Sequence, residues 1–180
     1  MNESDTELVA RSQEGDLSAF EQLILRYERS VRSIAWAYLR DSHAGDDVTQ
    51  ETFIAAYRSL SGLKESDKFG PWLMQIARRT SQRQSKGTNI PRDHGMPIDE
   101  VADVRSGASS RQRQLLEYIE KLPENERLVI AMRYFDGHSS QEIADVMERP
   151  LGTVTKQLSR AYERLRKWLT QTEEQVHERK

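Results

Sequence analysis

Apolar residues recur at three- and four-residue steps in several separate blocks of this chain, and this spacing constrains its fold more than any other feature. The longest block runs from Phe20 to Leu39, where apolar side chains form one stripe along a helix. Asp16 or Ser18 can cap its start, because a short oxygen-bearing side chain accepts a hydrogen bond from a free amide of the first turn. No segment shows the two-residue alternation typical of strands, so the sequence predicts an all-α protein.

Two more helices are predicted in the first half of the chain, where turn-forming residues separate the apolar blocks. Gly62 ends the first of them. Pro71 suits the first turn of the second, because proline lacks the amide that would be unpaired there. The predicted ranges run from about Asp46 to Leu60, after an interruption at residues 41–45, and from Trp72 to about Ser85.

The periodic pattern disappears between Lys86 and Ser110, in a stretch that contains three glycines and two prolines. We interpret this stretch as a flexible linker. The predicted fold class is therefore all-α, with two small helical bundles joined by a flexible linker and a helix-turn-helix in the C-terminal bundle. The predicted divisions are 1–86, 87–110 and 111–180, the last with a polar tail.

Four helices are predicted after the linker, and the last two have the layout of a helix-turn-helix. Ser139 or Ser140 caps a short helix, and Arg149-Pro150 separates it from a longer one with an apolar stripe. Residues 149–167 contain six basic residues against one acid, although the whole chain has a formal net charge of -2. This local positive charge favours DNA binding, because it can neutralise phosphates.

The outer face of the last helix supplies the candidate DNA contacts. Polar residues at its start can meet base edges in a major groove, and basic residues can meet phosphates. A solvated basic helix that caps a bundle is the alternative interpretation. The candidate residues are Arg149, Thr153, Thr155, Lys156, Gln157, Ser159, Arg160 and Arg164.

Several functional classes lack their sequence signals. The chain has no cysteine, so it can hold neither a disulfide nor a thiolate metal site. We find no signal peptide and no apolar run long enough to cross a membrane. Zinc spacings, glycine-rich phosphate loops and nucleophile elbows are missing as well. The sequence predicts a soluble cytoplasmic protein with no catalytic residue, metal or cofactor. Its histidines are scattered: His43, His94, His138 and His177.

Four segments together resemble a known family. In chain order, GDLSAFEQLILRYERSVRSIAWAYLRD, DDVTQETFIAAYRSL and KFGPWLMQIARR resemble the second conserved region of bacterial RNA polymerase sigma factors. The segment from Leu115 to Lys167 resembles their fourth region. The linker stands where the third region is missing, a layout similar to the small extracytoplasmic-function (ECF) group of the sigma-70 family.

The resemblance implies a specificity subunit that binds core RNA polymerase, through its β′ and β subunits, and promoter DNA. In the family, the helix that matches DDVTQETF docks on a coiled coil of β′. The matching polymerase-binding residues are Asp46, Asp47, Gln50 and Glu51, with Phe53 beside them. Phe53, Tyr57 and Leu60 are predicted to be core residues rather than contacts. An anti-sigma factor is a further implied partner.

The resemblance also implies that the first bundle opens DNA at the minus-ten element. In the family, the loop that matches Leu63 to Phe69 captures a base that has left the stack, and the next helix offers a basic face to the backbone. Trp72 is predicted to pack in the core instead of stacking on a base. The minus-ten candidates are Lys64, Lys68, Phe69, Arg78, Arg79 and Arg83, and the final bundle would bind the minus-thirty-five element.

Departures from the family pattern leave the promoter sequence open. Arg79 and Arg83 replace a usual asparagine and a frequent aspartate, and Glu148 stands where glycine is common. Lys156 and Gln157 also differ at predicted base-reading positions. The linker contains four acids, Asp93, Asp99, Glu100 and Asp103. They would either occupy a basic channel of the polymerase or remain solvated. Two other functions remain possible at this stage, a helix-turn-helix regulator that acts without polymerase and a protein-interaction adaptor.

Overall fold

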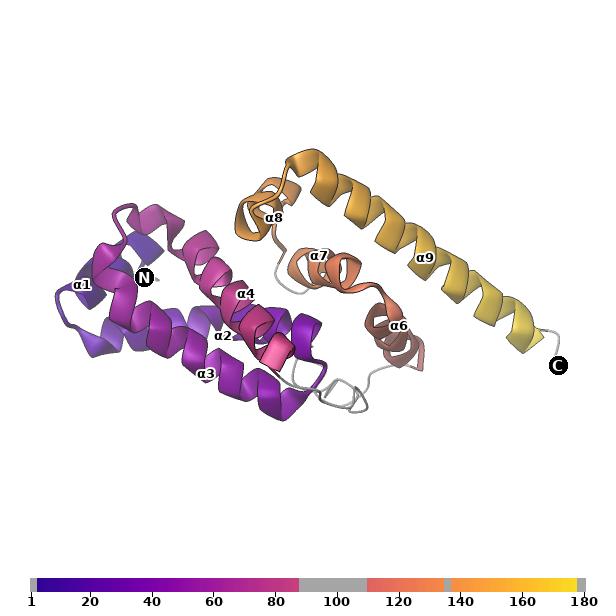
Figure 1. Cartoon of the computed structure of the whole chain (residues 1–180), viewed down its shortest axis with the longest axis horizontal. Coiled ribbons are helices and arrows are strands. Elements are labelled where there is room, and N and C mark those ends of the chain that lie inside the picture. Colours follow the sequence, from indigo (N-terminus) through magenta and orange to yellow (C-terminus); the bar gives the residue numbers. More distant parts are fainter. Residues whose placement is uncertain (1–2, 88–109, 135–136, 178–180) are drawn as a thin grey trace.

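The computed structural model describes residues 3–87, 110–134 and 137–177, and helices dominate all three ranges (Figure 1). No strand occurs in these ranges, which confirms the predicted all-α class. Nearly all of the predicted linker, including its four acids and His94, lies outside them. The helices are α1 (Asp5–Gln13), α2 (Leu17–Leu39), α3 (Ser42–Ser59), α4 (Phe69–Gly87), α6 (Ser110–Lys121), α7 (Glu124–Tyr134), α8 (Ser140–Met147) and α9 (Leu151–His177), with 3-10 turns η1 (Leu60–Gly62) and η2 (Ser66–Lys68).

The start of α2 follows the predicted cap. The Asp16 carboxylate accepts hydrogen bonds from the amides of Ser18 and Ala19, at 2.9 and 3.3 Å. These bonds satisfy two of the amides that a helix leaves unpaired at its start. The helix ends at Arg40, whose left-handed backbone (φ 56°) stops further turns. The apolar stripe between these two ends faces the core.

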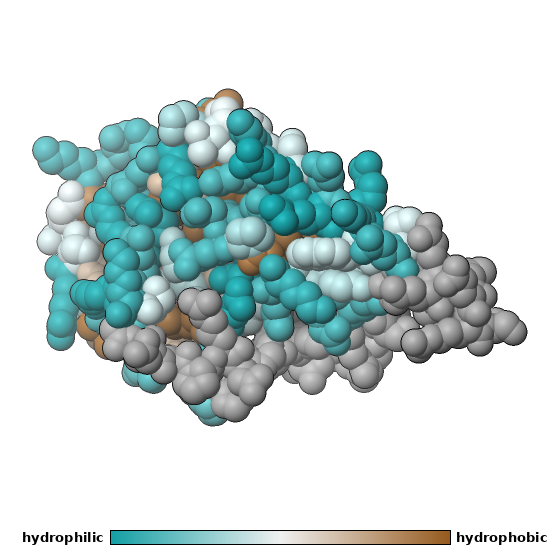
Figure 2. Space-filling view, turned by 45° about the vertical axis from the view of Figure 1, so that its right-hand side comes forward, coloured by the Kyte–Doolittle hydropathy of each residue, from teal (hydrophilic) through white to brown (hydrophobic). Residues whose placement is uncertain are grey.

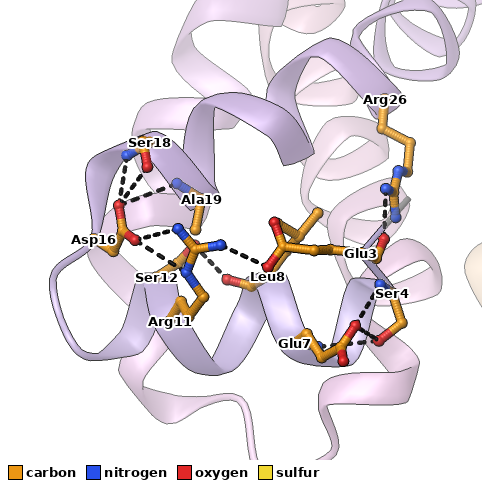
Figure 3. A network of polar contacts seen from close by, with 10 residues as sticks. All are labelled: Glu3, Ser4, Glu7, Leu8, Arg11, Ser12, Asp16, Ser18, Ala19 and Arg26. Atoms are coloured by element: carbon orange, nitrogen blue, oxygen red, sulfur yellow. Dashed lines mark hydrogen bonds and ion pairs between the residues drawn. The ribbon is translucent and has the colours of Figure 1, made fainter. Parts of the chain in front are cut away.

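The structure adds a helix that the sequence did not predict, α1, which a polar network holds against α2 (Figure 3). Ser4 and Glu7 form a capping box at its start. Arg11 then binds Glu3 and Asp16, each at 2.6 Å, and so joins both ends of α1 to the start of α2. The helix has few apolar residues, but Leu8 and Val9 are fully buried, and the ion pairs add to this packing.

Helix α3 begins four residues earlier than predicted. The Asp41 side chain accepts a hydrogen bond from the amide of Ala44 at 2.9 Å and caps the helix there. The chain remains helical through Gly45. The predicted interruption at 41–45 is therefore wrong beyond Asp41, because a local cap outweighs the low helix propensity of one glycine.

The core of the first helical group, α1 to α4, lies along the stripe of α2. Tyr27 and Phe69 meet edge to face with ring centroids 5.4 Å apart, and Phe69 also contacts Trp72. The Tyr27 hydroxyl donates to the Asp5 carboxylate. Burial raises the pKa of Tyr27, and this hydrogen bond raises it further. Fully buried members of this core include Leu8, Leu23, Ile34, Leu60, Phe69, Leu73 and Met74.

In the second helical group, α6 to α9, local caps again set the helix boundaries. Pro123 opens α7, because its carbonyl accepts from the amides of Glu126 and Arg127 at 2.9 Å. Ser139 and Glu142 form a capping box on α8, as predicted for Ser139. Helix α9 runs to His177 and buries Val154, Leu158, Ala161 and Leu165 of its predicted apolar stripe. Leu151, which was predicted in the same stripe, is 42% exposed.

The two groups pack against each other through α2 with α7 and through α4 with α8. Arg127 is 2% exposed, and its Nε donates to the Ala37 carbonyl at 2.7 Å. This carbonyl lies in the last turn of α2, where carbonyls lack partners within the helix and attract cations. The Arg127 Nη1 donates to the Leu122 carbonyl at 2.9 Å. One guanidinium therefore joins the start of α7 to the end of α2.

Packing of the helices leaves a predominantly polar exterior. On the face drawn in Figure 2, hydrophilic side chains cover most of the surface, and hydrophobic surface shows only in patches between them. Among the described residues, the larger apolar side chains that remain exposed are Leu17, Leu25, Ile54, Tyr57, Tyr134, Leu151 and Tyr162. Exposed apolar residues that gather around one groove are typical of an interaction surface.

Replacing each of two glycines with alanine should change the stability of the fold in opposite directions. A Cβ on Gly70 would lie 2.9 Å from Tyr27 Oη and 3.2 Å from its Cε1, and Phe69 and Asp5 hold that ring. A Cβ on Gly45 in α3 would meet nothing within 4 Å. We expect Gly70→Ala to lower the free energy of unfolding by about 1–3 kcal/mol, and Gly45→Ala to raise it by about 0.5–1 kcal/mol. Urea unfolding of both variants measures this difference, and equal shifts would contradict the packing of Tyr27.

Protonation of Asp16 should make the fold less stable in acid. Hydrogen bonds from Ser18 and Arg11 lower the pKa of Asp16 from 3.8 to about 2. Because the pKa is lower in the folded state, this carboxylate stabilises the fold fully above pH 3.8 and loses its effect as pH falls towards 2. Asp16→Asn retains a capping oxygen without the titration. The stability difference between wild type and this variant should shrink over that interval in pH-dependent urea unfolding, and a constant difference would contradict the role of Asp16.

Candidate functional site

An elongated groove runs between α2 and α3 on the surface of the first helical group. It encloses a volume of about 530 Å³, and most of its lining is apolar. Polar groups stand at its rim, so a partner could bury apolar surface in the middle and form polar contacts at the edge. We call it the α2–α3 groove, and its lining residues are Leu17, Phe20, Glu21, Ile24, Glu28, Arg32, Asp46, Thr49, Gln50, Phe53, Ile54, Tyr57 and Arg58.

The structure brings two of the four predicted polymerase-binding residues to this groove, Asp46 and Gln50. Asp47 is exposed on α3 but is not a lining residue. Asp46 lies 3.4 Å from Arg32 of α2 in an ion pair, which leaves the carboxylate half exposed. Glu51 instead pairs with Arg83 of α4. Asp46 and Gln50 therefore line the groove, whereas Asp47 does not and Glu51 faces α4.

The apolar lining was only partly predicted. Phe53 and Leu60 are buried, as expected for core residues. Tyr57 was expected in the core, but it is 40% exposed and lines the groove, with its ring 5.0 Å from that of Phe20. Ile54 is similarly exposed. The available signal was the width of the apolar pattern on α3, because apolar residues on two adjacent faces exceed what one core contact needs.

Helix α4 carries the basic residues predicted to meet the minus-ten DNA. Arg79 and Arg83 are exposed, but the side chain of Arg78 is only 14% exposed. All three make ion pairs, Arg83 with Glu51 and the other two with Glu148 of α8. We call Arg78, Arg79 and Arg83 the α4 basic face. Its charge is largely neutralised within this structure.

The contact between α4 and α8 is specific. Arg78 Nη2 donates to Glu148 Oε2 at 2.7 Å, and Arg79 Nη2 donates to Glu148 Oε1. Gln75 Nε2 adds a bond to the Asp145 carbonyl at 3.1 Å. The sequence pattern does not predict this contact, because its partners lie about 70 residues apart. The only local signal for this contact was Glu148 itself, a carboxylate at a position where the family that the chain resembles favours glycine.

The loop before α4 differs from its predicted role at one residue. Lys64 and Lys68 are exposed, and Lys68 pairs with Glu65. Phe69 was predicted to contact DNA, but its side chain is fully buried between Tyr27 and Trp72. A ring enclosed on both sides offers no face to a base, so Phe69 is a core residue here. Trp72 packs partly buried against the core, as predicted.

The start of α9 presents the predicted polar face. Thr153, Thr155, Lys156, Ser159 and Arg160 are exposed, opposite the buried stripe of this helix. The helix begins right after Pro150, whose carbonyl accepts from the Thr153 amide at 2.9 Å. A helix start adds the positive end of its dipole to the basic side chains.

Three other predicted residues on this side are less free. Arg149 is half-buried in the turn, and Gln157 is half-buried with its Oε1 lacking a hydrogen-bond partner in the described ranges. Arg164 Nε lies 3.0 Å from the nearly buried Glu126 Oε2, as an ion pair without the alignment of a hydrogen bond. Arg164 therefore joins α9 to α7 as well as facing solvent.

Other classes of site find no support in the described parts of the chain. No cluster of histidine, aspartate and glutamate there has the grouping needed for a metal ion. Among the same residues, no helix is both long enough and apolar enough to cross a membrane.

Family comparisons match the two helical groups separately. Residues 23–88 match the family model for sigma-70 region 2, and residues 112–165 match that for sigma-70, region 4. The chain is 32% identical over 183 residues to the RNA polymerase sigma-H factor of Pseudomonas aeruginosa, covering 93% of this chain and 94% of that protein. It is 34% identical over 177 residues to the ECF RNA polymerase sigma-E factor of Escherichia coli K12, covering 89% and 91%.

Solved structures share the fold. CnrH, solved in complex with the cytosolic domain of CnrY, superimposes with a TM-score of 0.72 at 24% identity over 93% of this chain and 98% of that one. RpoE of Bartonella quintana, solved with the anti-sigma factor NepR, gives 0.69 at 21% over 84% and 96%. These structures show the shared fold. The two matched regions and the relatives at 32% and 34% identity place the chain in the sigma-70 family, among its ECF RNA polymerase sigma factors.

Proposed function

We propose that this protein binds core RNA polymerase and directs it to promoters that carry two spaced elements, opening DNA at the minus-ten element. The observation that carries the proposal is the order of the two family regions, each of which coincides with one helical group. Each group also offers a basic helix, α4 in the first and α9 in the second. A regulator that acts without polymerase would need only the second group.

We assign the work to three parts of the chain. Residues 1–86 would bind core polymerase and the minus-ten element, residues 87–110 would serve as a linker, and residues 111–180 would bind the minus-thirty-five element. The chain would contribute recognition in the cytoplasm and leave catalysis to the polymerase, so we assign it no catalytic residue and no cofactor.

The α2–α3 groove is our candidate for the core-polymerase surface, specifically for a helical segment of the β′ subunit. Its exposed Ile54 and Tyr57 can bury apolar area, while Asp46 and Gln50 can pair with polar groups at the rim. The lining carries three acids against two arginines, and this small acidic excess favours encounter with a basic partner. Asp47 lies beside this rim, and Glu51 would join the contact only after leaving Arg83. An anti-sigma factor that covers the groove would block polymerase, and we propose such a partner as well.

The two DNA elements would be recognised by different chemistry. For the minus-ten element, Arg78, Arg79, Arg83, Lys64 and Lys68 would hold the backbone while bases leave the stack. For the minus-thirty-five element, the exposed start of α9 would enter a major groove. Polar side chains there would read bases, and basic ones would fix the register on phosphates. Those residues are Arg149, Thr153, Thr155, Lys156, Gln157, Ser159, Arg160 and Arg164.

Transcription with purified core RNA polymerase tests the function directly. The protein is added to fragments of genomic DNA from its own organism, and the new RNA starts are mapped by sequencing. Starts that share two upstream elements at constant spacing are expected. The absence of new starts, with folded protein and active core, would favour a regulator or an adaptor instead.

Substitution in the groove should weaken polymerase binding. Ile54→Ala removes exposed apolar surface at the middle of the proposed interface, and we expect the affinity for core polymerase to fall about tenfold. Leu25→Ala is the matched control, because Leu25 is an exposed apolar residue of α2 that does not line the groove. Titration of fluorescently labelled protein with core polymerase gives both affinities. Equal affinities for the two variants would contradict the assignment of the groove.

Substitution on α9 should weaken binding to the promoters recovered in the transcription assay. Lys156→Ala and Arg160→Ala should each reduce affinity and lower the slope of log affinity against log salt by roughly one, because each variant removes one cation that would neutralise a phosphate. Lys121→Ala is the control, because it removes the same charge from α6, away from the start of α9. An unchanged salt slope in both α9 variants would exclude these residues as phosphate ligands.

A further inference from the structure

The α4 basic face is occupied in this structure by another part of the same chain. One carboxylate, Glu148, accepts from two arginines, with Arg78 Nη2 at 2.7 Å and Arg79 Nη2 on its other oxygen. These are two of the arginines assigned to the minus-ten element. The side chain of Arg78 is only 14% exposed in this arrangement. Its guanidinium is therefore not available to a nucleic acid while α8 lies on α4.

The backbone conformation at Glu148 does not require a side chain. The residue ends α8 with a left-handed backbone, φ 52° and ψ 45°, a conformation that glycine adopts without strain. Its amide donates to the Ala144 and Asp145 carbonyls, and a glycine would make the same two bonds. The backbone thus gains nothing from a side chain here. What glutamate adds is the carboxylate that reaches both arginines of α4.

A carboxylate that accepts from two guanidinium groups takes the place of a phosphate. A carboxylate and a phosphate are both compact anions with oxygen acceptors. Arginine can bind each of them through parallel hydrogen bonds. DNA and Glu148 therefore compete for the same donors. Binding of a phosphate to Arg78 requires the Glu148 carboxylate to leave first.

A second, independent contact keeps α8 over α4. The buried Arg127 joins α7 to the Ala37 carbonyl of α2, and apolar packing continues across both helical groups. Gln75 also binds the backbone of α8 at Asp145, at 3.1 Å. Glu148 is thus held at the arginines by the packing of the two groups, and its local concentration there is high.

We propose that Glu148 is an internal inhibitor of the minus-ten surface: in the closed arrangement it keeps the Arg78 guanidinium from DNA and neutralises the exposed Arg79, and DNA gains Arg78 only when the two helical groups separate. The apparent affinity for single-stranded DNA is then lowered in proportion to the fraction of molecules in the open arrangement. This inference rests on the proposed role of the α4 basic face in DNA binding.

The test compares Glu148→Gln with Glu117→Gln in the full-length protein. Both remove one exposed acidic charge from the second helical group, but Glu117, which lies on α6, has no ion pair assigned to it within the described residues. The probe is a labelled single-stranded DNA of mixed sequence, about 12 nucleotides long. We expect Glu148→Gln to bind it roughly 3- to 10-fold more tightly than wild type, and Glu117→Gln to stay within about twofold.

A distance measurement shows whether DNA and the closed arrangement exclude each other. The chain has no cysteine, so Glu14→Cys and Lys167→Cys place one dye on each helical group without competing labelling sites. We expect DNA to lengthen the mean distance between the dyes, at lower DNA concentration in Glu148→Gln than in wild type. The inhibitor role is overturned if the two glutamine variants bind DNA equally, or if DNA binds without a change in distance.

Arg83→Ala separates failure of the inhibitor from failure of the DNA assignment. Arg83 belongs to the α4 basic face but pairs with Glu51, not with Glu148. Weaker DNA binding by Arg83→Ala, together with equal binding by the two glutamine variants, would retain the DNA surface and reject the inhibitor. Unchanged binding by Arg83→Ala and unchanged binding by Glu148→Gln would reject both.

Discussion

The burial of the α2 stripe is the interaction on which the rest of this structure depends. Helix α2 packs against α1, α3 and α4 of its own group and against α7 of the other. Its core residues, such as Leu23, Val31 and Ile34, are fully buried. Because one apolar helix supports partners on several sides, the orientations of α3, α4 and α7 follow from a common surface. The groove and the basic face then lie on helices whose positions α2 determines.

Charge is arranged differently on the surfaces that this packing creates. The α2–α3 groove keeps its apolar lining exposed, and Asp46 stands at the rim in only a weak ion pair. The arginines of α4 are instead paired with carboxylates, chiefly with Glu148 of α8. The start of α9 remains exposed and basic. In this arrangement the polymerase candidate and the minus-thirty-five candidate are open, while in the minus-ten candidate Arg78 is covered and the exposed Arg79 and Arg83 are paired with carboxylates.

Helices with strong local signals were predicted well. Asp16 and Ser139 cap α2 and α8 at the predicted places, and the buried stripe of α9 matches the predicted spacing. The exception was α1, whose few apolar residues leave no periodic pattern. Its polar contacts with α2 include those of Asp5 with Arg26 and Tyr27, which lie 21 and 22 residues further along the chain and leave no trace in local spacing. The start of α3 differs from its prediction because the Asp41 cap outweighs the low helix propensity of glycine.

The sequence by itself determined the described helices other than α1, their apolar stripes and the family regions, because caps and periodicity act between residues a few positions apart. It also determined which helices carry positive charge. Only the tertiary structure decided how much of that charge is free, because Arg78 and Glu148 lie 70 residues apart. It likewise placed Phe69 inside the core and Tyr57 on the groove. Side-chain exposure depends on which helices meet, and that is set by packing between distant segments.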